Sequence, residues 1–360
     1  MPGLDGVRAL AAVAIVVHHA ASTAEIGSGL AVLARPASVM DGAVVVFFVL
    51  SGFLVYRPFA EAHLGESPVP PVGRYLRRRA ARVLPAYWVA LAGLWALGAV
   101  DLGRSWWRMV LLLQPYDRLT VYGGIFQAWT LSVEVAFYLL VPVWAAGVRR
   151  IGRGRSSALI ELLGCAALVV AAFAFRAVVS ATNPTWRGLA FQWLPGYLDA
   201  FGAGMALAVL RARGRPERGA QWAPGLCWAA AAAICAGYAW RIGAPTDAML
   251  LDPHGAYRGT YWQRRQLVLV VVGLLLVAPL VFAGGRSRLV AVLSSRPVVL
   301  LGTVSYGLYL WHLGWIDLVV EHVDGGFPVA LAAGLGLGTA SALVSWYGVE
   351  RPLLRRVRGR

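Results

Sequence analysis

Apolar stretches long enough to cross a membrane alternate with short polar loops along the whole chain. Windows of about 20 residues, the length of helix that crosses a hydrocarbon core, mark about ten of them. They cover residues 7–24, 44–56, 84–100, 131–148, 158–181, 193–210, 225–240, 267–282, 298–320 and 329–347. The apolar stretch 106–113 is shorter and is followed by Pro115, which predicts a re-entrant or interfacial segment. The pattern therefore predicts an all-α, polytopic integral membrane protein with about ten transmembrane helices.

Composition and charge agree with this fold class. Of the 360 residues, 59% are hydrophobic and 14% are charged, which is too apolar for an ordinary soluble domain. The net charge of +16 comes from Arg alone, because the chain has no Lys, and the Arg residues collect in short loops rather than in a patch for nucleic acid. Loops 74–82, 149–155, 211–218 and 286–296 and the tail 351–360 are rich in Arg, whereas the intervening loops carry Asp247, Asp252, Glu321 and Asp324. The positive-inside rule then predicts that both termini are cytoplasmic.

The remaining sequence features predict a single membrane-embedded domain over residues 1–360. The first apolar segment lacks a basic stretch followed by a small-residue cleavage site, so we expect it to stay in the protein. Cys165, Cys227 and Cys235 all lie in apolar spans without metal-type spacing, which favours packing over a disulfide framework or a metal site. We expect no internal repeat and no appended soluble domain.

The first span carries polar residues on a defined face. Arg8 lies near its start, and His18 and His19 lie deep within it. At 100° per residue, the interval from Arg8 to His19 returns to within about 20° of the same face, about 16 Å further along the axis. One helix is therefore predicted to place a cation and an imidazole on one side at different depths.

Polar groups inside a membrane are costly, so they are candidates for function by default. Counted from the span boundaries, His19, Glu134, Arg176, Asp199 and His312 all fall in the outer half of their spans. This common depth predicts one polar chamber. An alternative for Arg176 and Asp199 is a purely structural ion pair.

Five motifs in order give the chain a resemblance to the membrane-bound type-3 acyltransferase family. They are Arg8 with His19, FFVLSGFLV at 47–55, RYLRRRAARVLPAYW at 74–88, WTLSVEVAFYL at 129–139 and SYGLYLWH at 305–312. Each motif alone is weak, since aromatic and Gly-rich membrane helices are common. Together they cover nearly the whole chain, on the same plan of about ten spans.

The resemblance implies O-acyl transfer from cytoplasmic acyl-CoA, with acetyl-CoA as the expected donor, to a hydroxyl of a sugar. Envelope polysaccharides and macrolide-type glycosides are the acceptor classes that it implies. It also implies that Arg8 and His19 are essential, that Arg79 and Arg82 form the family's RxxR pair, and that Glu134 is the acid of its WSLSxE motif.

The chain departs from that last motif at three positions. Thr130 replaces the usual Ser, and Val135 and Ala136 stand where Glu and Gln are common. Because the acid Glu134 is retained, the departure affects the expected substrate contacts more than the chemistry.

The chemistry accounts for these residue types. A neutral imidazole can take the proton of a hydroxyl as it attacks a thioester, and we assign this general base to His19. A carboxylate on the other ring nitrogen would fix its tautomer, the role predicted for Glu134. His18 points about 100° away and is expected to pack against a neighbouring helix. An alternative to direct transfer is a covalent acyl-enzyme on Ser51 or Ser132, although small hydroxyl residues are also ordinary helix-packing material.

The phosphates of coenzyme A need cations at the cytoplasmic face, and Arg8, Arg79 and Arg82 are predicted to bind them. The 16 Å or so between Arg8 and His19 is close to the reach of an extended pantetheine arm. The predicted substrate chamber is completed by Ser132, Tyr138, Arg176, Asp199 and His312.

Two other functions remain as alternatives. A secondary transporter or flippase would use the intramembrane ionisable groups as a proton relay, although the halves of the chain do not resemble each other. A membrane scaffold would leave Arg8, His19 and Glu134 without a purpose. For the acyltransferase we expect a multi-pass protein of the cell (inner or plasma) membrane, whose partners are the lipid bilayer and a carbohydrate or glycoside acceptor.

Overall fold

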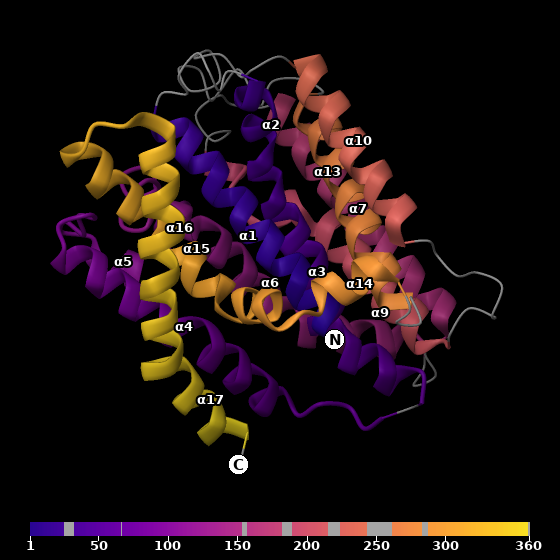
Figure 1. Cartoon of the computed structure of the whole chain (residues 1–360). Helices are drawn as coiled ribbons and strands as arrows, with labels where there is room; N and C mark the ends of the chain where they lie inside the picture. The colour runs from indigo at the N-terminus through magenta and orange to yellow at the C-terminus, as the bar shows by residue number, and fades with distance from the viewer. Residues whose placement is uncertain are drawn as a thin grey trace.

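A computed structural model describes residues 1–24, 32–65, 67–152, 157–181, 189–214, 224–242, 261–282 and 287–358. Its α-helices are α1 (Pro2–Thr23), α2 (Ala34–Val39), α3 (Ala43–His63), α4 (Val72–Ala96), α5 (Trp106–Val110), α6 (Trp129–Ile151), α7 (Ala158–Ala181), α9 (Leu198–Ala212), α10 (Pro224–Ile242), α13 (Tyr261–Phe282), α14 (Arg288–Leu293), α15 (Arg296–His322), α16 (Gly326–Ser345) and α17 (Arg351–Arg358). The described residues form no strand, so the protein is an all-α polytopic membrane protein (Figure 1).

Each predicted span coincides with one of the long helices, namely α1, α3, α4, α6, α7, α9, α10, α13, α15 and α16. Seven helical segments are long and apolar enough to cross a membrane: Pro2–Thr23, Ala34–His63, Phe126–Ile151, Ala158–Ala181, Tyr261–Phe282, Arg296–His322 and Gly326–Val357. Helices α4, α9 and α10 do not meet that criterion, so a total of about ten crossings stays a prediction. Helix α5 has 5 residues and is too short to cross, as expected for the segment 106–113.

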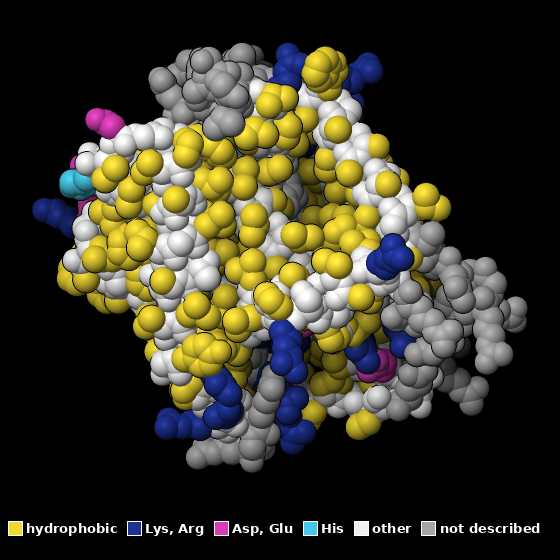
Figure 2. All heavy atoms as spheres, in the orientation of Figure 1, with side chains coloured by type: hydrophobic (Ala, Val, Ile, Leu, Met, Phe, Trp, Pro, Cys, Tyr) yellow, Lys and Arg dark blue, Asp and Glu magenta, His cyan; other side chains and the backbone are white. Residues whose placement is uncertain are grey.

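The two termini lie at the same end of the helix bundle (Figure 1). On the face drawn in Figure 2, most of the Arg side chains gather at that end, next to a broad band of apolar side chains. This arrangement places both termini on one side, and the prediction that this side is cytoplasmic rests on the charge pattern. Several loop residues used in that prediction lie outside the described residues: Arg153, Arg155, Arg215, Arg218, Asp247, Asp252, Arg286 and Arg360.

Small residues let the helices that carry the site approach closely. A Cβ atom built on Gly302 of α15 would lie 1.9 Å from the backbone oxygen of Asp5 in α1. In the same way, Cβ atoms on Gly52 of α3 and Gly204 of α9 would meet backbone oxygens of the opposite helix at 2.2 Å and 2.1 Å. Close contact through small residues is typical of helix pairs in membranes. It fixes α15 against α1, and α9 against α3.

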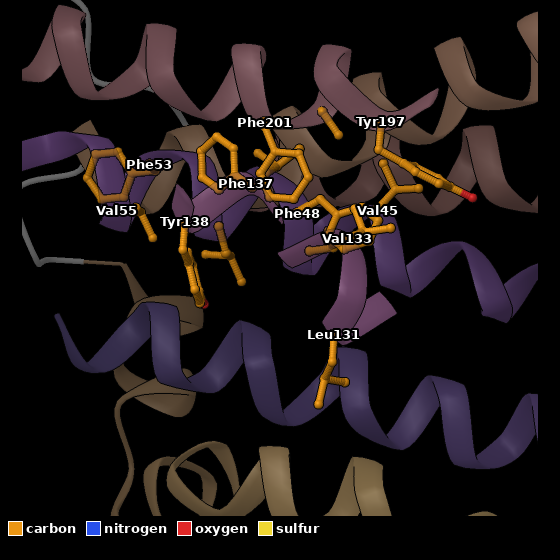
Figure 3. Packing of buried hydrophobic residues seen from close by; sticks show 14 of the residues in the cluster. Val45, Phe48, Phe53, Val55, Leu131, Val133, Phe137, Tyr138, Tyr197 and Phe201 are labelled. Atoms are coloured by element: carbon orange, nitrogen blue, oxygen red, sulfur yellow. The ribbon is translucent and has the colours of Figure 1, made fainter. Parts of the chain in front are cut away.

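An aromatic cluster fills the space between α3, α6 and α9 (Figure 3). The ring centroids of Phe137 and Phe201 lie 4.0 Å apart, and those of Phe48 and Phe201 lie 4.9 Å apart. Phe137 and Phe201 are fully buried. Stacked rings of this kind pack rigidly, so α6 is held in position against α3.

Candidate active site

The structure brings His19 and His312 together. Helix α1 begins with a Pro in its first turn and Asp5 close behind it, both of which favour a helix start. It then packs along α15, and the Nδ1 atom of His19 lies 2.7 Å from the Nε2 atom of His312. The two rings are stacked with centroids 5.0 Å apart. His312 is fully buried, whereas His19 is only partly buried.

The hydrogen bonds fix which nitrogen of each neutral ring carries the proton. The Nδ1 atom of His312 lies 3.0 Å from the carbonyl oxygen of Leu308, which can only accept, so this nitrogen is protonated. The lone pair of His312 is then on Nε2 and accepts a hydrogen bond from Nδ1–H of His19. The Nε2 atom of His19 therefore keeps its lone pair, and it has no hydrogen-bond partner among the described residues.

The imidazole of His18, next to His19 in the sequence, lies in a different environment. The Nδ1 atom of His18 lies 3.0 Å from the carbonyl oxygen of Ala37 in α2, so it donates a hydrogen bond to a neighbouring helix. This confirms the prediction that His18 packs away from the face that carries His19.

Arg8 lies in a second polar cluster, near the terminal end of the bundle. The charged groups acting on its guanidinium are Arg82, Glu134 and Asp5, and the Tyr138 side chain lies in the same range. The guanidinium of Arg79 lies over the ring of Tyr138, 5.6 Å from its centroid. The structure thus gathers Arg8, Arg79 and Arg82 from two helices at one place, on the face of α1 that also carries His19.

Glu134 belongs to this second cluster and not to the histidine pair, so the predicted contact with His19 is wrong. Its Oε1 atom accepts a 2.9 Å hydrogen bond from Ser51 Oγ, and the Tyr138 side chain lies close to it. No interaction among the described residues joins it to His19 or His312.

The depth of Glu134 follows from where α6 begins. The preceding 3-10 turn, Phe126–Ala128, is anchored on α15, because Gln127 Nε2 donates to the carbonyl oxygens of Tyr309 and Leu310 at 2.9 Å and 3.2 Å. Helix α6 therefore starts inside the bundle, beside α15. Glu134 lies about 7.5 Å further along the axis of α6 than Trp129. The prediction had assumed that this helix starts at the membrane surface.

Arg176 and Asp199 form a third cluster, which corrects the prediction of one shared chamber. The Nη2 atom of Arg176 lies 2.8 Å from Asp199 Oδ2, and both side chains are almost completely buried. Its other nitrogens donate to Gln263 Oε1 at 2.9 Å and to the Gly196 carbonyl oxygen at 2.6 Å. Because each guanidinium nitrogen already has a partner, the arrangement favours the structural ion pair that the sequence left as an alternative.

The two serines considered as nucleophiles lie in different surroundings. The Ser51 hydroxyl donates its hydrogen bond to the Glu134 carboxylate, as described above. Ser132 is buried, and its Oγ atom has no hydrogen-bond partner within the described part of the chain. No described side chain is therefore bonded to Ser132 as a base that could activate it as a nucleophile.

Sequence reasoning missed the network that connects α6 to the histidine pair. The Tyr309 hydroxyl donates to the Gln127 carbonyl oxygen at 2.9 Å and lies 2.8 Å from Thr130 Oγ1. Tyr309 and His312 are three residues apart on one helix face, with ring centroids 5.9 Å apart. That spacing within SYGLYLWH is the sequence signal that could have placed Tyr309 and His312 on one face of their helix. Among the described residues, no three His, Cys, Asp or Glu side chains gather as a metal site requires.

Comparison with known families places this arrangement in an enzyme class. The profile of the acyltransferase domain family matches residues 1–347, so the chain belongs to that family of acyltransferases. This confirms the resemblance found in the sequence motifs.

Individual relatives come from bacteria. The exopolysaccharide production protein ExoZ of Rhizobium meliloti is 27% identical over 337 residues, which cover 88% of this chain and 90% of that protein. The acyltransferase MdmB of Streptomyces mycarofaciens is 31% identical over 48% of this chain and 44% of its own length. The peptidoglycan O-acetyltransferase OatA of Listeria monocytogenes is 22% identical over 90% of this chain and 50% of its own length. No solved structure matches the chain significantly.

Proposed function

We propose that the protein transfers an acyl group, with acetyl as the first choice, from cytoplasmic acyl-CoA to a hydroxyl of a sugar or glycoside. The observation that carries the proposal is the histidine pair, which leaves the Nε2 lone pair of His19 on the same helix face as the Arg8 cluster. The relatives are named for exopolysaccharide production and peptidoglycan O-acetylation, which supports an envelope glycan as acceptor. Such a role fits a protein of the bacterial cell (inner or plasma) membrane.

His19 acts as the general base in this mechanism. Its Nε2 atom removes the proton of the acceptor hydroxyl as the hydroxyl oxygen attacks the thioester carbonyl carbon. The carbon–sulfur bond breaks, and the imidazolium of His19 returns the proton to the departing thiolate. The products are an ester and free coenzyme A, with no covalent enzyme intermediate. His312 holds the His19 ring in the tautomer that this step needs, the role assigned to Glu134 from the sequence.

The Arg cluster binds the donor. Arg8, Arg79 and Arg82 offer planar guanidinium groups that pair with phosphate oxygens through charge-assisted hydrogen bonds. Glu134 lies among these cations, accepts a hydrogen bond from Ser51 and lies close to Tyr138, so it orients the donor-binding side chains. The axial rise of about 16 Å from Arg8 to His19 lets the thioester reach the base while the phosphates stay at the terminal end.

The test is release of free thiol from acetyl-CoA and ester formation by purified protein with membrane glycan extract. We expect His19→Ala to lower the rate about a hundredfold to ten-thousandfold, the usual loss for a general base. His18→Ala is the matched control, since it removes the adjacent imidazole of the same helix and should have a much smaller effect. Normal turnover by folded His19→Ala protein would refute the mechanism. Absence of thiol release by the wild type would favour the transporter alternative.

A further inference from the structure

A cavity of about 390 Å³ lies outside the three polar clusters, between α1, α2, α3, α10 and α13. Val7, Ala14, Pro36, Ala236 and Leu276 are among the residues that line it, and its wall is almost entirely carbon. Figure 2 shows the surface hollowed between α1 and α10. We name this cavity the α1–α10 groove. Its chemistry fits a hydrocarbon chain and no polar ligand.

The groove uses a different side of α1 from the active site. Val7, Leu10, Ala11 and Ala14 line it, and on average they point about 120° away from the direction shared by Arg8 and His19. The next residue on the groove side of α1 is His18. Helix α1 therefore separates the groove from the path of the acyl donor, so the groove is not a pocket for the donor's acyl chain.

The groove is long enough to hold a hydrocarbon chain. Its wall on α10 extends from Trp228 to Ala239, a rise of about 16 Å. The Trp228 end lies towards the chain termini, where the indole Nε1–H donates to the Leu276 carbonyl oxygen at 3.2 Å. The Ala239 end lies near the other end of α10, which ends at Ile242. A hydrocarbon chain in this groove would extend from the Ala239 end towards the Trp228 end.

An arginine side chain, that of Arg35, lies at the Ala239 end of the groove. Arg35 directly precedes the lining residue Pro36, and its guanidinium lies over the Trp240 ring at 4.8 Å, next to the lining residue Ala239. Arg35 is exposed and forms no ion pair with an acidic residue of the described chain. An exposed guanidinium held by an aromatic ring is suited to bind a phosphate. The positive charge of Arg35 complements a phosphate attached to the end of the hydrocarbon chain that lies near Ala239.

We propose that the α1–α10 groove binds the hydrocarbon chain of a membrane-anchored sugar acceptor, in which a phosphate held by Arg35 links the chain to the sugar. This inference rests on the proposed function, because it names the acceptor class for that active site. The position of His19 is the reason for choosing an acceptor rather than a bilayer phospholipid. His19 lies one turn, an axial rise of about 6 Å, before α1 ends at Thr23. Its neighbour His18 donates to the carbonyl oxygen of Ala37, two residues after Arg35, so the base and Arg35 lie near the same end of α1.

Binding is tested with farnesyl phosphate that carries a photoreactive diazirine at the end of its chain. In full-length protein in detergent, we expect cross-links to the α10 and α13 residues that line the groove. Ala236→Phe places a ring in the groove and should reduce labelling about tenfold, the loss expected when about two methylenes can no longer be buried. Ala233→Phe is the matched control, because Ala233 is equally exposed on α10 but does not line the groove.

Three competitors identify the occupant. Unlabelled farnesyl phosphate should compete better than farnesol, and Arg35→Gln should abolish that difference. Excess phosphatidylglycerol should not displace the probe. Equal labelling of both Phe variants, or displacement by phosphatidylglycerol, would overturn the proposal, since the groove would then hold no chain or an ordinary bilayer lipid.

An activity measurement links the groove to catalysis. The acceptor found in the thiol-release assay is compared with the same acceptor after its lipid chain has been removed. We expect Ala236→Phe to raise KM about tenfold for the chain-bearing form and to leave the chain-free form unchanged. Equal KM values for the two forms in the wild type would refute the inference and leave the proposed function intact. If the wild type releases no thiol, the proposed function fails, and the cross-linking result still decides whether the groove binds such a chain.

Discussion

The hydrogen bond between His312 and His19 gives the sharpest prediction, because it can be tested with two substitutions of His312. One of them, Gln, offers an acceptor to His19, and the other, Leu, does not. His312→Leu replaces the imidazole by an apolar side chain of similar bulk in this fully buried position. It thereby removes the Nε2 lone pair that accepts the hydrogen bond from His19. His312→Gln offers an amide oxygen near the same place. We therefore expect His312→Leu to impair catalysis and His312→Gln to retain much of it.

The size of the loss follows from the state of His19 in the Leu variant. Its Nδ1–H faces an apolar side chain, and leaving a buried donor unpaired costs about 1–3 kcal/mol. The ring can avoid this cost by moving its proton to Nε2, the nitrogen that must act as base. If the whole cost falls on the transition state, kcat decreases by about 5- to 150-fold. The KM for acyl-CoA should stay near the wild-type value, because Arg8 and its neighbours form a separate cluster.

The assay measures thiol release against acyl-CoA concentration for the three proteins, after thermal unfolding has shown that each is folded. A folded His312→Leu protein with wild-type kcat would refute the reasoning. Equal losses in the Leu and Gln variants would also refute it, because the deciding feature would then be the imidazole ring rather than an acceptor for His19.

Three further predictions concern the donor site, the helix contact and the buried ion pair. Arg8→Gln should raise the KM for acyl-CoA and leave the acceptor KM unchanged, and Arg8→Lys should restore donor affinity only partly, because Lys lacks the planar fork; full rescue by Lys would reduce Arg8 to a membrane anchor. Gly302→Ala should destabilise the protein by about 1–3 kcal/mol in thermal unfolding, because its Cβ atom would lie 1.9 Å from the Asp5 backbone oxygen, whereas Gly147→Ala meets nothing within 4 Å and serves as the control. Arg176→Met should cost about 3–5 kcal/mol by leaving the Asp199 carboxylate buried and unpaired, and adding Asp199→Leu should restore both stability and activity; a stable but inactive double variant would instead assign the pair to the substrate site.

The fold class could be predicted from the sequence because membrane insertion acts on each segment almost independently. A run of apolar residues must form a helix to satisfy its own backbone in lipid, so each predicted span coincides with a helix. The sequence does not fix the number of crossings, because α4, α9 and α10 fall short of the length and hydropathy typical of a membrane span. Helix α4 carries a row of Arg and α9 has 15 residues, so length and hydropathy do not decide whether they span.

For the site, the sequence determined which side chains share one face of a single helix. The periodicity of α1 places Arg8 and His19 on one face and His18 on another, and the structure agrees. The RxxR spacing likewise brings Arg79 and Arg82 together on α4.

Only the tertiary structure decided which helix faces which and at what depth. His19 meets His312 because Gly302 lets α15 approach the backbone of α1, and Glu134 lies beside Arg8 because Gln127 anchors the start of α6 inside the bundle. Depth counted from span boundaries failed for Glu134, since that count assumes that every helix begins at the membrane surface. The local sequence sets the helical period, whereas the axial offset between two helices is set by side-chain contacts between segments far apart in the chain.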